Sequence, residues 1–288
     1  MEASAVPLGF CVEKQRVLWY NIHEKFSEKG AGVAMKYYVV SDIHGFYSKF
    51  HSALENAGFF ADTEPHKLVV LGDLFDRGRE ARMLQSFILE RMEKDEVILI
   101  RGNHEDLFVD LVTTDCGMAY RHHKLNGTYD TALQLTGFDA QEAFARCAAF
   151  ADAAQKTPFY QQILPVMVDY FETKHYVFVH GWIPCHAADG EYRPHSDWRA
   201  ASPFEWQRAR WYNGMDAIRG TTEEKTIVCG HWHASYGHAR YEGKGGEFDE
   251  GADFSPYYAP GIIAVDGCTA YSGLVNIVVL EDEPGIGG

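Results

Sequence analysis

From Lys36 onward, short apolar runs alternate along the chain with longer segments in which apolar residues recur at helical spacing. The runs predict strands at residues 37–40, 68–71 and 97–100, and the segments between them predict helices at 47–57 and 80–92. The first half of the chain therefore has the order βαβαβ. Because the runs are continuously apolar instead of alternating, we expect both faces of these strands to be covered and the strands to pair in parallel.

The second half of the chain predicts further strands and a helical insertion. Four more apolar runs predict strands, at residues 176–179, 226–229, 262–265 and 274–280. We expect a helical insertion from about residue 106 to 165, in which the alanine-rich stretch 140–154 is the clearest helix. The glycine-rich, acidic stretch 243–253 predicts a surface loop.

Residues 1–34 stand apart from this pattern as an N-terminal extension, and residues 35–288 are expected to form one α/β domain. Two interpretations of the extension are open. It is either a poorly ordered or partly helical terminus, or a helix that docks on the body or on a partner. The second interpretation depends on one apolar helical face, formed by Val17, Leu18, Trp19, Ile22 and Phe26.

Composition narrows the class of protein. The 26 Lys and Arg against 41 Asp and Glu give a formal net charge of −15, without any Lys- or Arg-rich stretch, so no nucleic-acid partner is expected. No apolar run approaches the roughly 20 residues needed to cross a bilayer, so no membrane segment is expected. The six cysteines are scattered without CxxC spacing, and the N-terminus has no signal-peptide pattern. We therefore expect a reduced, cytoplasmic protein.

Five short polar clusters stand directly after apolar runs. They are Asp42 and His44; Asp73, Asp76 and Arg77; Arg101, Asn103, His104 and Glu105; His180; and His231 and His233. In open α/β sheets the carboxyl ends of the strands meet at one edge, so these side chains should come together. Taken singly, each cluster could be a helix cap, a turn or a pair of half-buried imidazoles. Five such clusters in order favour one shared site.

The chemistry of the clusters indicates metal ions. Carboxylate and imidazole groups without thiolates favour Mn, Fe or Zn, whereas Mg²⁺ prefers oxygen ligands. A carboxylate can bridge two cations about 3.5–4 Å apart, and such a pair clamps a phosphoryl group while it lowers the pKa of a bound water. The residues therefore predict a two-metal site that needs no protein nucleophile.

The clusters run in the order D-x-H, G-D-x-x-D-R-G, G-N-H-E, H and G-H-x-H, which resembles the calcineurin-like metallophosphoesterase superfamily over residues 36–280. The DRG and RGNHE forms are similar to those of bacterial phosphoprotein phosphatases and symmetrical diadenosine tetraphosphatases. Residues 264–268, followed by Gly273 and Leu274, also resemble a strand near the end of that family. The resemblance implies a four-layer α/β/β/α sandwich with two facing mixed β-sheets. It also implies two metal ions, Mn or Fe, with Zn as a third candidate.

The resemblance further implies a role for each matching residue. It assigns seven metal ligands: Asp42 and His44 to the first ion, Asp73 as the bridge, Asn103, His180 and His231 to the second ion, and His233 as an additional ligand of the first. His104 would be the general acid that protonates the leaving oxygen, and Asp76 would orient it.

Three arginines are candidates for binding the phosphate oxygens: Arg77, Arg101 and Arg210. Arg77 matches the arginine of the DRG motif, while Arg101 could equally brace its loop. Arg210 is preferred over Arg208 as the arginine from the second half. The other interpretation of that segment is a helix with two exposed arginines beside buried tryptophans.

The function implied is hydrolysis of phosphomonoesters, of the Ser/Thr phosphoprotein-phosphatase type, by attack of a metal-bound hydroxide. An alternative is hydrolysis of a dinucleoside polyphosphate such as diadenosine tetraphosphate, and a third hypothesis is a non-catalytic binding module on the same fold. The segments V-H-G-W-I-P and G-H-W-H depart from the family pattern and leave the substrate class open. Five tryptophans either stack on a base or fill the core: Trp182, Trp198, Trp206, Trp211 and Trp232.

Overall fold

The computed structural model describes residues 34–114, 120–188, 191–221 and 223–283. The apolar face expected around Trp19 lies outside these residues. Within them, the strands form two larger sheets and one hairpin. The first sheet has the order β11 (Val278–Asp282), β1 (Met35–Val40), β2 (His66–Val70) and β3 (Val97–Leu99). The second has the order β4 (Tyr170–Glu172), β5 (Tyr176–Val179), β8 (Thr226–Cys229), β10 (Ile262–Ala264) and β9 (Tyr257–Ala259), and the hairpin joins β6 (Cys185–Ala188) to β7 (Glu191–Pro194).

Both larger sheets are mixed. In the first, β1, β2 and β3 pair in parallel, which confirms the prediction, and β11 is antiparallel to β1. In the second, β5, β8 and β10 are parallel, and β4 and β9 flank them in the antiparallel direction. The parallel strands of both sheets leave polar loops at their carboxyl ends.

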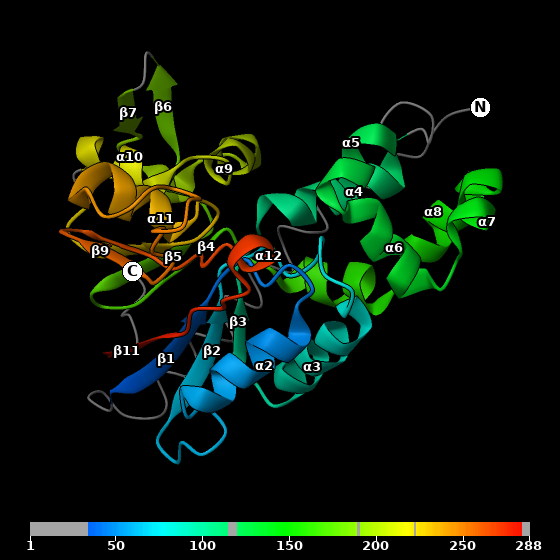
Figure 1. Ribbon diagram of the computed structural model, residues 1–288, viewed down its shortest axis with the longest axis horizontal. Coiled ribbons are helices and arrows are strands. Elements are labelled where there is room, and N and C mark those ends of the chain that lie inside the picture. Colours follow the sequence, from blue (N-terminus) through cyan, green and yellow to red (C-terminus); the bar gives the residue numbers. More distant parts are fainter. Residues whose placement is uncertain (1–33, 115–119, 189–190, 222, 284–288) are drawn as a thin grey trace.

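The two sheets face each other across a shared apolar layer. Tyr37 and Val39 of β1 pack in one cluster with Phe178 of β5 and Val228 of β8. The alternating residues of β1, such as Val40, point to the other side, into a cluster with the helices. Because successive residues of a strand point to opposite faces, each parallel strand must be apolar at every position. The continuously apolar runs are therefore explained by the four layers α/β/β/α (Figure 1).

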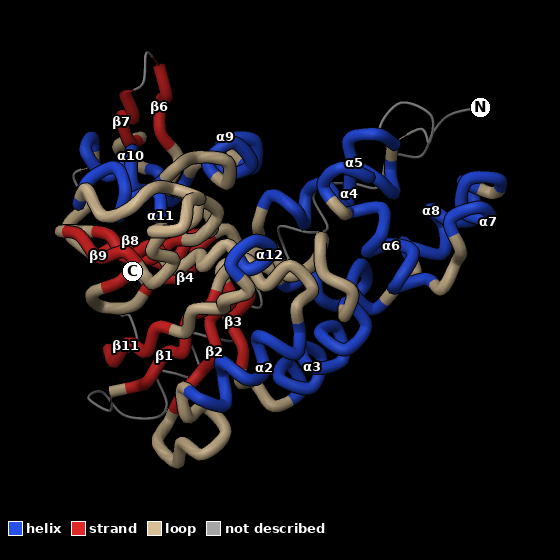
Figure 2. The backbone as a smooth tube through the Cα atoms, viewed as in Figure 1, coloured by secondary structure: helices blue, strands red, loops and turns tan. Residues whose placement is uncertain are grey.

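Helices cover the outer face of each sheet and also form a separate group beside the first sheet (Figures 1 and 2). The first sheet is covered by α2 (Tyr47–Asn56) and α3 (Ala81–Glu93). The second carries α9 (Pro203–Ala209), α10 (Gly214–Ala217) and α11 (Ala234–Gly237), and α12 (Thr269–Ser272) precedes β11. Short 3₁₀ or π turns lie at Phe159–Ile163, Leu164–Val166, Trp198–Ala200, Ile218–Gly220 and His238–Glu242. Among the described ranges, no helix is long and apolar enough to span a bilayer.

The stretch expected to be a helical insertion is helical where it is described. It contains α4 (Asn103–Thr113), α5 (Tyr120–Asn126), α6 (Thr128–Thr136), α7 (Ala140–Ala145) and α8 (Cys147–Gln155). The single helix predicted over 140–154 is wrong in one respect, because the chain breaks at Arg146, where φ is −126° and ψ is 46°. Neither Gly nor Pro lies at this break, so the local sequence does not predict it.

The last predicted strand begins later than expected. Residues 274–277 lie outside β11, which spans Val278–Asp282. The Asn276 side chain donates to the carbonyls of Phe254 and Val265, at 2.8 and 3.0 Å, and the Thr269 hydroxyl donates to the Leu274 carbonyl at 2.8 Å. These bonds hold the segment as a loop against the second sheet.

Candidate metal centre

The five polar clusters all lie at the carboxyl ends of parallel strands, four of them in loops and the third in the loop after β3 and the first turn of α4. The loops bind one another through their backbones: the Asp42 amide donates to Gly72 at 3.3 Å, and the His44 amide donates to Asp73 at 3.0 Å. Within the second sheet, the Gly230 amide donates to the His180 carbonyl at 2.7 Å, and across the two sheets the His231 amide donates to Asp42 Oδ2 at 2.9 Å. The predicted convergence at one edge is therefore what the fold produces.

The backbone of these loops is strained. Seven of the eight non-glycine residues with positive φ in the described chain lie in loops after parallel strands: Asp42, His44, Asp73, Asp76, Arg77, His231 and Cys268. Their φ angles lie between 50° and 76°. A left-handed residue with a side chain costs about 1–2 kcal/mol, and such residues cluster at functional sites. The strain marks this edge as the site.

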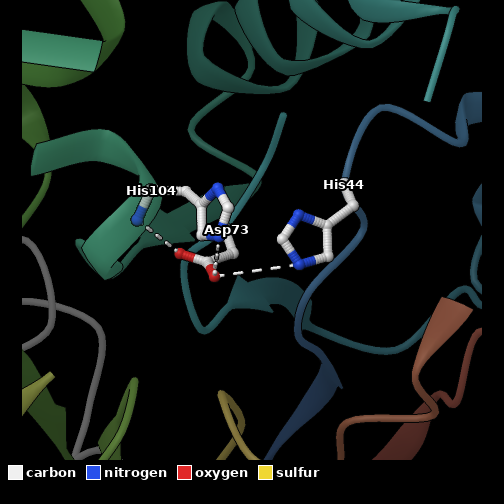
Figure 3. Close-up of side chains that lie close together, drawn as sticks. All are labelled: His44, Asp73 and His104. Carbon is white, nitrogen blue, oxygen red and sulfur yellow. Dashed lines mark hydrogen bonds and ion pairs between the residues drawn. The ribbon is translucent and has the colours of Figure 1, made fainter. Parts of the chain in front are cut away.

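Two trios of ligating side chains share Asp73. One consists of His44, Asp73 and His104, and the other of Asp73, His180 and His231, with the ligand atoms of each trio within 4.8 Å of one another. Figure 3 shows the first trio, with both imidazoles directed toward the Asp73 carboxylate. The two oxygens of Asp73 divide between the trios: Oδ2 lies 3.8 Å from His44 Nε2, and Oδ1 lies 3.4 Å from His180 Nε2. This is the arrangement expected of a carboxylate that bridges two cations.

Hydrogen bonds behind the histidines fix which nitrogen faces the centre. His44 Nδ1 is 2.8 Å from the Phe75 carbonyl, and His180 Nδ1 is 2.6 Å from the Leu71 carbonyl. A carbonyl oxygen only accepts, so each Nδ1 carries the hydrogen and each Nε2 of the neutral ring keeps its lone pair. Metal-ligating histidines are commonly oriented in this way.

The contact between His180 and Asn103 fits a bound cation. His180 Nε2 lies 2.7 Å from Asn103 Oδ1. Because Nδ1 is already the donor, Nε2 of a neutral His180 is an acceptor, and two acceptors then face each other. A cation ligated by both atoms removes this mismatch.

The buried acidic residues at this edge are also consistent with bound cations. Burial and then the neighbouring Asp42 and Asp73 charges raise the pKa of Asp266 well above its usual value, and burial and Asp73 raise the pKa of Glu105 to about 7. Conversely, burial and His180 lower the pKa of His231 to about 3, so this imidazole is neutral and able to donate a lone pair. Asp42 is held in place by the His231 amide, which donates to its Oδ2 at 2.9 Å.

His104, a member of the first trio, forms a close pair with Asp76. His104 Nδ1 donates to Asp76 Oδ2 at 2.6 Å, while His104 Nε2 faces Asp73 Oδ2 at 3.9 Å. Burial lowers the pKa of His104, but Asp73 and Asp76 outweigh it and raise the pKa to about 9. When the ring is protonated, both nitrogens carry a hydrogen, including Nε2, which faces the centre.

The three candidate arginines have different surroundings. The Arg77 side chain is exposed. The pKa of His44 is held well below its usual value, first by the burial of His44 and second by the charge of Arg77, so the guanidinium lies beside the centre. Arg101 Nε donates to Asp106 at 2.8 Å. Arg210 is buried, and its two terminal nitrogens donate to Asp106, at 2.5 Å, and to Asp169. Both terminal nitrogens of Arg210 are therefore paired with carboxylates, whereas Arg77 has no polar partner among the residues that the structure describes.

His233 is not brought into either trio. Its Nδ1 lies 2.9 Å from the Ser235 hydroxyl, and its Nε2 lies 3.0 Å from Glu247 Oε1. The Ser235 hydroxyl donates to the Glu247 carbonyl, and so it accepts from His233. Both ring nitrogens thus have protein partners in this arrangement.

Comparison with known proteins agrees with this geometry. The family model of calcineurin-like phosphoesterases matches residues 35–261. The chain belongs to this family.

Curated relatives of this phosphoesterase carry nucleotide-hydrolase names. An asymmetrical bis(5′-nucleosyl)-tetraphosphatase of Bacillus velezensis is 26% identical over 138 residues, which cover 44% of this chain and 51% of the relative. A symmetrical bis(5′-nucleosyl)-tetraphosphatase of Nitrosospira multiformis is 33% identical over 96 residues, which cover 33% of each chain. The chain thus spans about half the length, or less, of the curated relatives that it matches.

A solved structure shares the fold of this phosphoesterase. A point mutant of a cold-active protein tyrosine phosphatase superposes with a TM-score of 0.52 at 17% identity, over 86% of this chain and 76% of that one. At this identity the likeness concerns the fold.

Two acidic residues of the phosphoesterase centre were not predicted as site residues. Glu105 Oε2 accepts from the Asp73 and Gly102 amides, at 2.9 and 2.7 Å, and Oε1 accepts from the Leu74 amide at 3.0 Å. Asp266 follows β10 at the same edge and accepts from the Cys268 amide at 2.7 Å. The rule that found the other clusters, a polar residue directly after an apolar strand, also selects Asp266. Glu105 ends the R-G-N-H-E cluster, but no role in the site was predicted for it.

The tryptophans divide clearly. Trp182, Trp198 and Trp206 are buried and fill the core of the second sheet, and Trp232 is half-buried. Trp211 is 48% exposed, and its ring lies 5.7 Å from that of His231 at an angle of 82°. Of the five, it alone presents an exposed aromatic surface at the candidate centre.

Proposed function

We propose that this protein is a dinuclear-metal phosphoesterase that hydrolyses phosphomonoesters, such as phosphorylated Ser or Thr in proteins. The observation that supports this function best is the pair of trios that share Asp73, in one of which His104 is also paired with Asp76. The residues that would hold the two ions are Asp42, His44, Asp73, Asn103, His180 and His231. Manganese or iron is the proposed metal, with zinc as a third candidate.

The reaction follows from the placement of the side chains. Two such cations, when bound, lower the pKa of a water molecule and offset the charge of the phosphoryl group. The water loses one proton to the solvent, its oxygen bonds to phosphorus, and the bond from phosphorus to the leaving oxygen breaks. His104 gives its Nε2 proton to that oxygen, while Asp76 stabilises the ring through Nδ1. Arg77 binds a non-reacting phosphate oxygen, and Arg101 is the second candidate for this contact.

Hydrolysis of p-nitrophenyl phosphate by Mn²⁺-loaded protein tests this proposal. We expect chelation with EDTA to abolish the activity, and Asp73→Asn to lower kcat/KM by more than about 100-fold, since even outer partners of metal ligands contribute 10- to 100-fold. Glu55→Gln, an exposed charge on α2, serves as the matched control and should change nothing. A preparation that holds two equivalents of metal and hydrolyses no phosphoester would contradict the proposal and favour a binding module.

A second candidate substrate is a dinucleoside polyphosphate, and Trp211 is the observation that favours it. The exposed indole beside His231 offers a stacking surface for a base. The curated relatives named as bis(5′-nucleosyl)-tetraphosphatases support the same substrate class.

Replacing Trp211 tests this candidate. We expect Trp211→Ala to raise KM for diadenosine tetraphosphate at least about fivefold, because base stacking on an aromatic ring contributes about 1–3 kcal/mol. Trp211→Phe should retain most of the affinity, and KM for a phosphoserine peptide should stay unchanged in both variants. Chromatography of the products separates symmetric cleavage, which gives only ADP, from asymmetric cleavage to AMP and ATP. An equal KM for wild type and Trp211→Ala would rule out the stacking role.

A further inference from the structure

One face of α6 lies along the loop that contains Asp76 and Arg77. Thr128, Thr131 and Gln134 recur every three residues and therefore lie on the same side of this helix. The Thr128 hydroxyl donates to Asp76 Oδ2 at 2.7 Å, and the Thr131 hydroxyl accepts from the Asp76 amide at 2.9 Å. The helical stretch thus contacts both the side chain and the backbone of the residue that orients His104.

The same helix face contacts the rest of the loop. Gln134 accepts from the Ala81 amide at 3.1 Å and donates to the Gly78 carbonyl at 3.0 Å. At the start of the helix, Gly127 has φ of +86°, and a Cβ there would lie 2.4 Å from the Arg77 amide nitrogen. Only glycine permits this approach. The loop from Asp76 to Ala81 is therefore held along its length by α6.

The Thr128 hydroxyl and His104 share one carboxylate oxygen. His104 Nδ1 donates to Asp76 Oδ2 at 2.6 Å, and Thr128 donates to the same atom. Thr128 and Thr131 are 0% and 1% exposed, so water does not replace these bonds. A buried carboxylate that loses one of two donors gains freedom to rotate, and the ring that it orients follows.

We propose that Thr128, supported by Thr131, is a positioning residue that aligns His104 through Asp76 for proton transfer to the leaving group. The inference rests on the proposed phosphoesterase function. It gives the helical stretch a part in the reaction although α6 contributes no group to either trio. The contribution of Thr128 then depends on how much the leaving group needs a proton.

Two aryl phosphates separate this role from a general loss of structure. p-Nitrophenolate leaves with little proton transfer, whereas phenolate, whose conjugate acid has a pKa of about 10, needs the proton. We expect Thr128→Val, which keeps the side-chain shape, to lower kcat for phenyl phosphate about tenfold and kcat for p-nitrophenyl phosphate by no more than about twofold, with KM unchanged. Thr128→Ser restores the hydroxyl and should recover most of the loss.

The control is Thr136→Val on the same helix, where the hydroxyl donates to the Ala132 carbonyl of α6 itself at 2.7 Å. It should leave both rates unchanged. In the Asp76→Asn background, Thr128→Val should add no further selective loss. If Thr128→Val lowers the melting temperature below that of the assay, Thr128→Ala takes its place.

Equal losses on both substrates, or no loss on either, would overturn the positioning role. So would a Thr128→Ser variant as impaired as Thr128→Val. A wild-type protein that hydrolyses neither substrate in the metal-loaded form would instead refute the proposed function itself.

Discussion

At the scale of single residues, the backbone of the centre is strained, and buried hydrogen-bond acceptors hold this strained backbone in place. Asp42, His44 and Asp73 adopt left-handed φ angles of 52°, 50° and 52°. Such a strained conformation is stable only where contacts with the surrounding residues hold it in place. Around Asp73, the Glu105 carboxylate holds the backbone, because it accepts hydrogen bonds from the amides of Asp73, Leu74 and Gly102. The Glu105 side chain is buried, with 1% of its surface exposed. One carboxylate therefore joins the loops after β2 and β3.

Glu105→Gln is predicted to destabilise the protein and weaken metal binding. The amide of glutamine keeps one acceptor oxygen and turns an NH₂ group toward a backbone N–H, so at least one buried donor loses its partner. A buried unsatisfied group costs about 1–3 kcal/mol, and we expect the free energy of unfolding to fall by that amount. Urea denaturation measures this loss, and titration with Mn²⁺ should show about 10- to 100-fold weaker binding.

Glu93→Gln, at the exposed end of α3, is the matched control for this change. It should alter neither stability nor Mn²⁺ affinity. If Glu105→Gln keeps the wild-type unfolding free energy and metal affinity, Glu105 does not hold the loops.

At the scale of elements, the strands of the parallel core were predictable and several neighbouring features were not. Strands 176–179 and 226–229 have the same bounds in the structure as in the prediction, because each is apolar on both faces and bounded by polar residues. The loops after them bring their polar residues to one edge for the same reason. This part of the fold is local in origin, and hence a sequence pattern reveals it.

The features that the pattern did not reveal depend on contacts between distant elements. The break at Arg146 carries no turn residue, and residues 274–277 are a loop because Asn276 binds backbone carbonyls outside its own segment. Similarly, the ion pairs of Arg210 with Asp106 and Asp169 join residues 104 and 41 positions apart. Periodicity and motif spacing carry no information on such pairings.

At the scale of the whole molecule, the centre depends on how the two sheets are placed relative to each other. His44, Asp73 and His104 come from loops of the first sheet, whereas His180 and His231 come from the second. A shift between the sheets would separate the trios that share Asp73. The sheets are held by the apolar layer between them and by polar bonds at the end of β11.

Asp282, the last residue of β11, is one of the polar links between the sheets. Its carboxylate accepts from the Thr173 hydroxyl at 2.6 Å, from the His175 amide at 2.7 Å and from His175 Nδ1 at 2.6 Å, all in the turn between β4 and β5. Burial alone would raise the pKa of Asp282, but these hydrogen bonds outweigh it and lower the pKa below its usual value. The ionised form is therefore the one that the folded state stabilises.

We predict that Asp282→Asn lowers the free energy of unfolding at pH 7 by about 1.5–3 kcal/mol, the range for hydrogen bonds to a charged group. Because the folded pKa lies below the unfolded value of about 3.9, the stabilisation is fully present above that value and is lost as pH falls through the folded pKa. Urea denaturation at pH 7, 5 and 3 measures the gap between wild type and variant, which should be equal at the first two and smaller at the third. Glu281→Gln, exposed on the same strand, should show no gap, and a pH-independent gap for Asp282→Asn would mean that the charge of the carboxylate does not hold the sheets together.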